Sequence, residues 1–247
     1  MRSLLFVPGN KENMLTKALG TRPDVLVPDM EDSVPDTEKE TARRTIAAFL
    51  TRLASTGALL VPRVNALDTE WHEADLAAVI GPEIHGVSVG KIRRAGDIAA
   101  ISALIARFEL RAGIAVGHVR LIPWIETAEA IVNCREICAA SDRIIAVAFG
   151  AEDFTNDMGI DRLDDESQLA HARSALCIAA RAAGVAALDT PYFRFRDRDG
   201  LERNARAAKH VGFKGKFAIH PEQLDALDAC FSPSPDEIAE AERIVAA

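Results

Sequence analysis

Residues 119–153 read VRLIPWIETAEAIVNCREICAASDRIIAVAFGAED, and this stretch decides the fold. Short apolar runs at Val119–Ile122 and Ile144–Ala148 flank an alanine-rich stretch, Ala128–Ala139, whose apolar residues recur at helical spacing. Both runs are apolar on two faces, which is typical of strands that are covered on both sides in a parallel sheet. The stretch therefore predicts a strand, a crossover helix and a second parallel strand.

The same alternation extends over the whole chain. Further apolar runs occur at Leu4–Val7, Val25–Val27, Leu59–Val64, Gly86–Val89, Ala186–Leu188 and Phe217–Ile219. Stretches with helical spacing lie between the runs, for example Thr37–Leu53, Asp97–Leu110 and Gln168–Ala183. Eight strand-and-helix units in 247 residues average about 31 residues each, the size of the repeating unit of a (β/α)8 barrel.

The competing α/β architecture is a doubly wound open sheet. Such a sheet usually carries a phosphate-binding loop, and neither G-x-G-x-x-G nor G-x-x-x-x-G-K-[ST] occurs in this chain. No composition shift and no linker rich in Pro, Gly and Ser divides the sequence. We therefore predict a single (β/α)8 TIM-barrel domain over residues 1–247, with a last amphipathic helix at Asp236–Ala247.

The composition excludes several classes of function. The formal charge is -8, whereas a nucleic-acid surface normally needs a basic face. The four cysteines form no C-x-x-C pair, which indicates a reducing compartment, and Cys134 and Cys138 are expected to be buried thiols on one helical face. The apolar run after Met1 ends at Pro8–Gly9, too early for a signal peptide or a membrane span. We expect a cytoplasmic protein that binds neither nucleic acid nor membrane.

In a (β/α)8 barrel the residues that follow the strands meet at one mouth, where the chemistry takes place. Polar residues follow seven of the eight predicted strands, at Asp29, Glu31, Asp32, Arg63, Asn65, Lys91, Glu126, Thr127, Glu152, Asp153, Asp189, Thr190 and His220. Converging carboxylates repel one another unless a cation lies among them. Oxygen ligands without cysteine or clustered histidine favour Mg2+ or Mn2+, so Glu126 with Glu152 or Asp153 are candidate ligands. Arg63 can bind a substrate carboxylate or an enolate oxygen.

Each of these residues can also be explained by a purely structural role. An acidic residue at a strand end is more often a helix cap or a solvated loop charge. This applies most to Asp29, Glu31 and Asp32, of which one could cap the next helix while another pairs with Arg63. His220 is either a candidate base or a histidine that the backbone satisfies.

Six short motifs occur in order along the chain. They are RSLLFVPG (residues 2–9), PDMEDSVP (28–35), RVN (63–65), IPWIETAE (122–129), FGAEDFT (149–155) and AIHPEQ (218–223). Together they resemble the HpcH/HpaI aldolase and citrate lyase family, in the branch of citrate lyase β-subunit-like proteins near the malyl-CoA lyases. Each motif alone is weak, but the set is specific because it extends with ordinary spacing from Arg2 to about Ala246.

The resemblance implies a (β/α)8 barrel that assembles as trimers or hexamers and a Mg2+-dependent lyase that acts on acyl-CoA thioesters. Matched residue by residue, Glu126 and Asp153 correspond to the family's metal ligands. Arg63 corresponds to the arginine that contacts the substrate carboxylate and the enolate. In that chemistry the metal on Glu126 chelates an oxo acid, so Glu126 and Arg63 are also the expected substrate-binding residues.

The resemblance assigns the surroundings of the metal as well. Glu31 and Asp32 match the acidic pair near the metal-bound waters, and with Arg63 they are the expected catalytic residues. Lys11, which follows the first motif, lies where relatives contact the CoA nucleotide. Cleavage of a β-hydroxy acyl-CoA would release an acetyl-CoA-type product and an oxo acid such as oxaloacetate or glyoxylate, and condensation is the reverse.

Three departures from the family pattern concern the substrate more than the fold. Longer relatives continue past the position of Ala247 into a D-G-x-M-x-D segment whose aspartate reaches a neighbouring active site, so we expect either a truncated sequence or a short branch with another proton donor. The fourth predicted strand ends in Val89-Gly90-Lys91 where relatives often have Leu-Pro-Lys, and Ala130 stands where many have Gly.

These departures keep three functions besides the lyase open. Two are enzymes on the same metal site, a free-acid aldolase and a hydrolase of short acyl-CoA thioesters. The third is a non-catalytic binding or assembly subunit that kept the barrel.

Overall fold

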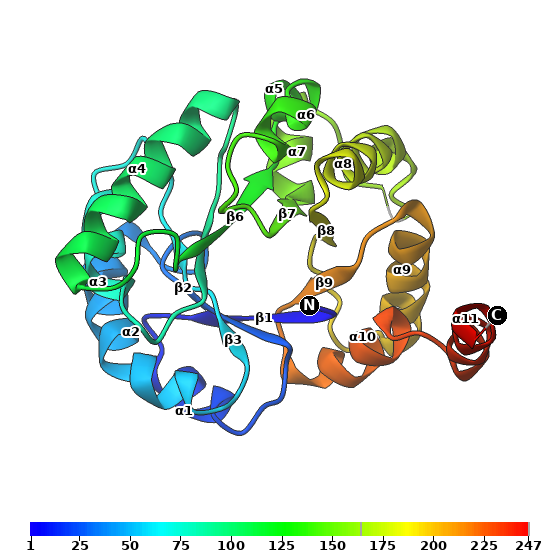
Figure 1. Cartoon of the computed structure of the whole chain (residues 1–247), viewed down its shortest axis with the longest axis horizontal. Coiled ribbons are helices and arrows are strands. Elements are labelled where there is room, and N and C mark those ends of the chain that lie inside the picture. Colours follow the sequence, from blue (N-terminus) through cyan, green and yellow to red (C-terminus); the bar gives the residue numbers. More distant parts are fainter. Residues whose placement is uncertain (164, 247) are drawn as a thin grey trace.

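Parallel strands close into a barrel in the computed structural model, which describes residues 1–163 and 165–246. The sheet order is β1-β9-β8-β7-β6-β5-β4-β2-β3, and β1 also pairs with β2, which closes the ring (Figure 1). The strands are β1 (Ser3–Pro8), β2 (Val25–Asp29), β3 (Leu59–Leu60), β4 (Arg63–Val64), β5 (Gly86–Val89), β6 (Arg120–Ile125), β7 (Ala146–Phe149), β8 (Ala186–Asp189) and β9 (Gly215–Ala218). Because β3 and β4 both pair with β2, they are two parts of one barrel strand.

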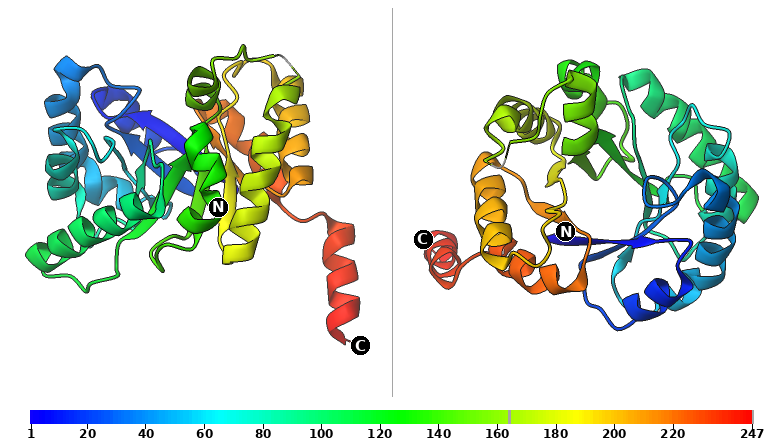
Figure 2. Two further views of the ribbon diagram at one scale, coloured as in Figure 1. Left: turned by 90° about the horizontal axis from the view of Figure 1, so that it is seen from above. Right: turned by 180° about the vertical axis from the view of Figure 1, so that it is seen from behind.

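Most helices surround the barrel and connect successive strands, while α10 and α11 follow the last strand. They are α1 (Glu12–Ala18), α2 (Lys39–Ala54), α3 (His72–Val79), α4 (Ala95–Ala112), α5 (Ala128–Val132), α6 (Cys134–Cys138), α7 (Ala151–Met158), α8 (Ala170–Ala183), α9 (Arg198–Val211), α10 (Leu224–Phe231) and α11 (Pro235–Ala246). Short 3-10 turns are η1 (Asp36–Glu38), η2 (Ser167–Leu169) and η3 (Pro221–Gln223). Figure 2 shows that α11 stands apart from the ring formed by the other helices. Within the described ranges, no helix is long and apolar enough to cross a membrane.

The predicted (β/α)8 fold is confirmed, and each of the eight predicted strands is present. The run Leu59–Val64 is divided at Pro62, which has no N–H to donate to the sheet. The predicted helix Ala128–Ala139 is interrupted at Asn133, whose backbone (φ -92°, ψ 3°) leaves the helical region. The predicted last helix corresponds to α11, and its expected end at Ala247 lies outside the described residues.

Alternation along the strands separates two cores. Inward residues fill the barrel interior, and they are Leu4, Val25, Val27, Val61, Ile122, Trp124, Ala146, Ala148, Leu188 and Phe217. Outward residues join the larger core between strands and helices. At the centre of the barrel, Phe6 and Trp124 pack on Phe217, with ring centroids 5.0 and 4.5 Å from its ring. These aromatic rings form a rigid floor beneath the mouth.

Candidate active site

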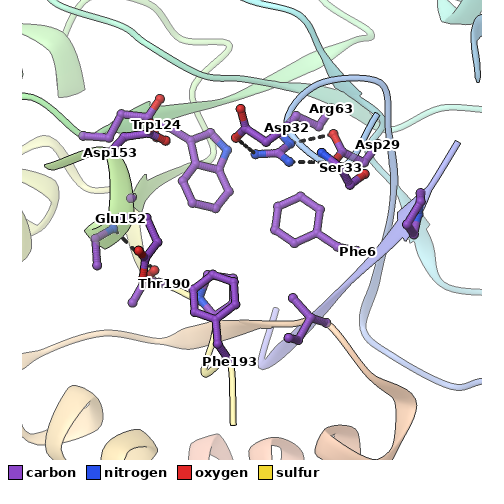
Figure 3. Close-up of a pocket in the computed structure, with 16 residues that line it drawn as sticks. Phe6, Asp29, Asp32, Ser33, Arg63, Trp124, Glu152, Asp153, Thr190 and Phe193 are labelled. Atoms are coloured by element: carbon purple, nitrogen blue, oxygen red, sulfur yellow. Dashed lines mark hydrogen bonds and ion pairs between the residues drawn. The ribbon is translucent and has the colours of Figure 1, made fainter. Parts of the chain in front are cut away.

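A cavity of about 430 Å³ opens over the aromatic floor, lined by residues that end or follow the barrel strands. Figure 3 shows its labelled side chains around one central space. Four of the predicted site residues line it, namely Asp32, Arg63, Glu126 and Asp153, together with Asp29, Glu152 and Thr190 from the strand-end set. The expected convergence on one mouth is therefore observed for these residues of the strand-end set.

Arg63 is held in one orientation by carboxylates from the loop after β2. Its Nε and Nη2 donate to the two oxygens of Asp29 at 2.7 and 2.6 Å, and its Nη1 donates to Asp32 at 2.9 Å. Nη1 also lies 3.1 Å from an oxygen of Glu31. The guanidinium carbon lies 4.5 Å from the ring centroid of Phe6, and Figure 3 shows Arg63 between Asp29 and Asp32. The cation is thus fixed before any ligand binds.

Asp29 combines the two roles that the sequence left open for the acidic residues. It is fully buried, pairs with Arg63, and accepts hydrogen bonds from the backbone N–H groups of Glu31 and Ser33 at 2.9 and 3.1 Å. Burial alone would raise the pKa of Asp29, but the Arg63 charge and hydrogen bonds hold it below its usual value. Asp29 is therefore the structural member of the acidic set, which leaves Glu31 and Asp32 for the site.

Lys91 lies between the carboxylates of two loops. Its backbone has a left-handed φ of 59°, which is rare for a residue other than glycine. This conformation directs its N–H to Glu126 Oε1 at 2.5 Å, while its Nζ lies 2.9 Å from Glu31 and 3.3 Å from Asp32. A Cβ on Gly90 would come within 2.7 Å of Glu31 and 3.0 Å of Glu126, so only glycine leaves room there. The sequence showed Lys91 at a strand end but gave it no role.

Glu126 is a buried carboxylate that forms no ion pair with a cationic side chain within residues 1–163 and 165–246. Only 3% of the residue is exposed, and its Oε2 lies so close to Gly150 that a Cβ there would overlap it. Burial, with the nearby charges of Glu31 and Asp153, raises the pKa of Glu126 to about 8. Burial and the Asp32 charge also raise the pKa of Asp153. The two predicted metal ligands are thus the carboxyl groups that local cations compensate least.

We call Asp29, Glu31, Asp32, Arg63, Lys91, Glu126 and Asp153 the mouth cluster. It has five carboxylates and two cations, so it carries an excess of negative charge. In the part of the chain that the structure describes, no three His, Cys, Asp or Glu side chains are grouped to hold a metal. Mg2+ does not require such a set, because it commonly binds one or two carboxylates and keeps several waters. Glu126 and Asp153 fit such a site, since a divalent ion would offset their repulsion.

Other strand-end residues are directed away from the cavity. Thr127 caps α5 by accepting from the N–H of Ala130 at 3.1 Å, and Asn65 donates to the Met30 carbonyl behind the acidic loop at 3.0 Å. The His220 ring stacks on Phe195, and its Nδ1 accepts from the backbone of Glu222 at 3.3 Å. The interpretation of His220 as a histidine that the backbone satisfies is therefore supported.

The remaining predicted residues have separate surroundings. Lys11 lies at the rim, where its Nζ is 3.7 Å from Glu38 and half of its side chain is exposed. Glu152 is half-exposed and pairs with Arg162, so Asp153 is the better partner for Glu126. Cys134 is a free, buried thiol on α6, as expected, and Cys138 is another.

The fold and this cavity define a (β/α)8-barrel protein whose candidate site lies at the C-terminal mouth of the barrel. The chain belongs to the HpcH/HpaI aldolase/citrate lyase family, whose sequence model matches residues 2–221.

Named relatives match the whole chain. It is 35% identical over 246 residues to the citrate lyase subunit beta of Leuconostoc mesenteroides, covering 100% of this chain and 82% of that protein. It is 36% identical, with the same coverage, to a (3S)-malyl-CoA thioesterase of Cereibacter sphaeroides. Among solved structures, the citrate lyase beta subunit of M. tuberculosis, complexed with oxaloacetate and magnesium, matches with a TM-score of 0.78 and 28% identity. That match covers 94% of this chain and 97% of the other.

Proposed function

We propose that this protein is a Mg2+-dependent carbon–carbon lyase that cleaves a β-hydroxy acyl-CoA to an acetyl-CoA-type product and an oxo acid such as oxaloacetate or glyoxylate, or joins them. The observation that carries the proposal is the fixed Arg63 cation beside the uncompensated Glu126 and Asp153 carboxylates in one cavity. The similarity to citrate lyase beta subunits over the whole chain supports it.

Glu126 and Asp153 are the residues that would hold Mg2+, with Mn2+ as a substitute. When bound, the ion supplies Lewis-acid polarisation of the keto and carboxylate oxygens of the oxo acid. Gly90 and Gly150 contribute by leaving room for the Glu126 carboxylate beside the backbone. The N–H of Lys91 fixes one oxygen of that carboxylate, which orients the other.

Arg63 would stabilise the charge that develops during cleavage. The bond between the α and β carbons breaks, its electron pair passes to the α carbon of the thioester as an enolate, and the β hydroxyl loses its proton as the oxo group forms. A guanidinium that is already oriented by Asp29 needs no rearrangement to stabilise this enolate or a substrate carboxylate.

The hydroxyl proton needs an acceptor at the cavity. Asp32 lines the cavity with a half-exposed side chain, whereas Glu31 is buried behind it and contacts both Arg63 and Lys91. We therefore propose that Asp32 accepts this proton and returns it to the α carbon of the enolate, which gives the acetyl-CoA-type product. Glu31 would hold the Arg63 and Lys91 cations in place. In this proposal Asp32 takes part in proton transfer, whereas Glu31 has a positioning role.

The CoA arm would lie in a second recess of about 220 Å³ beside the cavity. The two spaces share Phe6, Pro8 and Ile219, and the recess is mainly apolar, which suits a pantetheine chain. Lys17 lines this recess and Lys11 lies on the rim after β1, so both place positive charge where a nucleotide phosphate could bind.

Thioester hydrolysis is the second candidate, because the (3S)-malyl-CoA thioesterase is as similar to this chain as the lyase subunits are. A free-acid aldolase would use the same metal site without CoA, and a non-catalytic subunit would bind the oxo acid without turning it over. A cytoplasmic location and assembly as homotrimers or hexamers stay predictions.

Calorimetric titration of metal-free protein with oxaloacetate, glyoxylate and acetyl-CoA, each with and without Mg2+, tests the site. We expect oxo-acid binding that requires Mg2+ and is lost in Glu126→Gln. The absence of binding under every condition would overturn the proposed site.

Product analysis separates the reactions. Malyl-CoA cleavage gives acetyl-CoA and glyoxylate, whereas hydrolysis gives malate and a free CoA thiol that a thiol reagent detects. Turnover of malate without CoA would favour the free-acid aldolase. Mg2+-dependent oxo-acid binding without turnover of any thioester would favour the non-catalytic subunit.

A further inference from the structure

Lys39, the first residue of α2, is a buried lysine that binds backbone rather than a carboxylate. Only 5% of the residue is exposed. Its Nζ donates to the carbonyl oxygens of Met30 at 3.1 Å and Glu31 at 2.9 Å, and it lies 5.2 Å from the ring centroid of Trp71. Over residues 1–163 and 165–246, no ion pair to an Asp or Glu accompanies these contacts. A buried ammonium with this arrangement must have a specific task, because its desolvation is costly.

The carbonyls that Lys39 binds belong to the loop that carries the acidic pair. Met30 is tied at three places, since its carbonyl also accepts from Asn65 Nδ2 at 3.0 Å and its N–H donates to the Arg63 carbonyl at 3.0 Å. Asn65 is in turn fixed by Asp75, whose Oδ2 lies 2.6 Å from the same Nδ2. The loop is thus held from outside, while its side chains at Glu31 and Asp32 face the cations of the mouth.

We propose that Lys39 is a positioning residue that fixes the backbone of Met30–Asp32, so that Glu31 and Asp32 meet Arg63 and Lys91. The inference rests on the proposed function for its effect on turnover, although the effect on the loop is independent of it. Three carboxylates within four residues repel one another, and a cation on the backbone side of the loop adds to the compensation that Arg63 and Lys91 give from the cavity side. Lys39 does not line the cavity, so it acts through the residues that it holds.

Hydrogen exchange tests the fixed loop directly. The N–H groups of Met30, Glu31, Ser33 and Val34 are all hydrogen-bonded, so a peptide covering residues 29–34 should exchange slowly in the wild type. In Lys39→Met we expect faster exchange confined to this peptide. Lys39→Arg should restore protection in part, because a guanidinium can also donate to two carbonyls.

Lys214→Met is the matched control, since Lys214 is exposed and precedes β9 at the opposite end of the barrel. Its exchange in residues 29–34 should equal that of the wild type. Unchanged exchange of this peptide in Lys39→Met would overturn the proposal. Faster exchange over the whole chain would overturn it too, because the lysine would then stabilise the fold at large.

Turnover of an acyl-CoA substrate, expressed per folded molecule, supplies the second readout. In Lys39→Met we expect kcat to fall by about 10- to 100-fold, the usual cost of losing a partner behind the reacting groups, with little change in KM for the thioester. If the wild type shows no Mg2+-dependent oxo-acid binding, the proposed function fails and the exchange result alone decides the role of Lys39. If the wild type turns over and Lys39→Met equals it, the positioning role fails while the function stands.

Discussion

Two ionic clusters in this protein are built from similar residue types but differ in how far their carboxylates are paired with cations. The mouth cluster faces the cavity, whereas a wall cluster lies between the barrel and its outer helices and consists of Glu166, Arg173, Asp189 and Lys216. Arg173 donates to Asp189 at 3.1 Å and to Glu166 at 3.0 Å, and Lys216 pairs with Asp189. In the wall, each carboxylate thus has a cation of its own.

The pKa shifts express this difference. Burial raises the pKa of Asp189, but the charges of Lys216 and Arg173 outweigh it and keep the pKa below its ordinary value. The same holds for Glu166, through Arg162 and Lys216. In the mouth cluster burial prevails at Glu126, whose pKa rises to about 8. A buried carboxylate therefore marks a binding site only where local cations do not already compensate it.

Removing a carboxylate from each cluster should give opposite results, and the largest effect is expected in the mouth. Glu126→Gln should abolish Mg2+-dependent turnover and weaken Mg2+ binding by more than the ~10- to 100-fold that a partner behind a ligand costs. Its unfolding free energy should not fall, because the variant lacks the carboxyl group that the fold must keep protonated at a cost in stability. Calorimetry measures the Mg2+ affinity and urea denaturation measures the unfolding free energy. Full activity in this variant would contradict the assignment of Glu126 as a metal ligand.

In the wall cluster, Asp189→Asn should lower stability and leave Mg2+ binding unchanged. It leaves Lys216 buried without its carboxylate and leaves Arg173 with Glu166 alone, and breaking such a buried pair costs about 3–5 kcal/mol of stability. Mg2+ affinity of the folded variant should match the wild type. A variant as stable as the wild type in urea would show that the wall cluster is not the balanced structural unit described above.

A pH series sharpens the contrast. Glu126 has an ordinary pKa of 4.5 and a folded pKa of about 8, so between these values the folded protein keeps a proton that the unfolded chain has lost. Stability of metal-free protein should therefore fall as pH rises through this window, by about 1.4 kcal/mol per unit of pKa difference. Thermal unfolding of metal-free protein at pH 5 and pH 8 measures this loss of stability. Glu126→Gln should remove most of the loss. Added Mg2+ should raise the stability of the wild type at pH 8.

The smallest effect is expected at the rim, outside both clusters. Lys11→Ala removes a half-exposed charge, and such charges contribute about 1 kcal/mol or less. The KM for an acyl-CoA should rise a few-fold, with no change in oxo-acid binding. Steady-state kinetics of Lys11→Ala and of Lys214→Ala, a variant of another exposed lysine, measure this rise in KM. Equal KM values in the two variants would show that Lys11 is not part of the CoA site.

The predicted strands and helices followed from periodicity, because apolar runs and helical spacing are local properties of the chain. The site residues were harder to predict from the sequence than the strands and helices, as Asp189 and Glu126 illustrate. Both follow a predicted strand in the sequence, yet Asp189 is directed into the wall and Glu126 into the cavity. Which face a residue takes depends on the phase of its strand, and β6 extends to Ile125, three residues beyond the predicted Ile122.

The sequence by itself determined the alternating (β/α)8 pattern and the types of residue available at the mouth, because both depend on local order along the chain. Only the tertiary structure decided which charges are paired. Asp29 and Arg63 are 34 residues apart, and Glu31 and Lys91 are 60 apart. Closure of the barrel brings them together, and within the described residues it gives Glu126 and Asp153 no ion pair of their own, so that Arg63 and Lys91 offset their charges only in part. That imbalance depends on distances and burial between strands, which the order of residues does not contain.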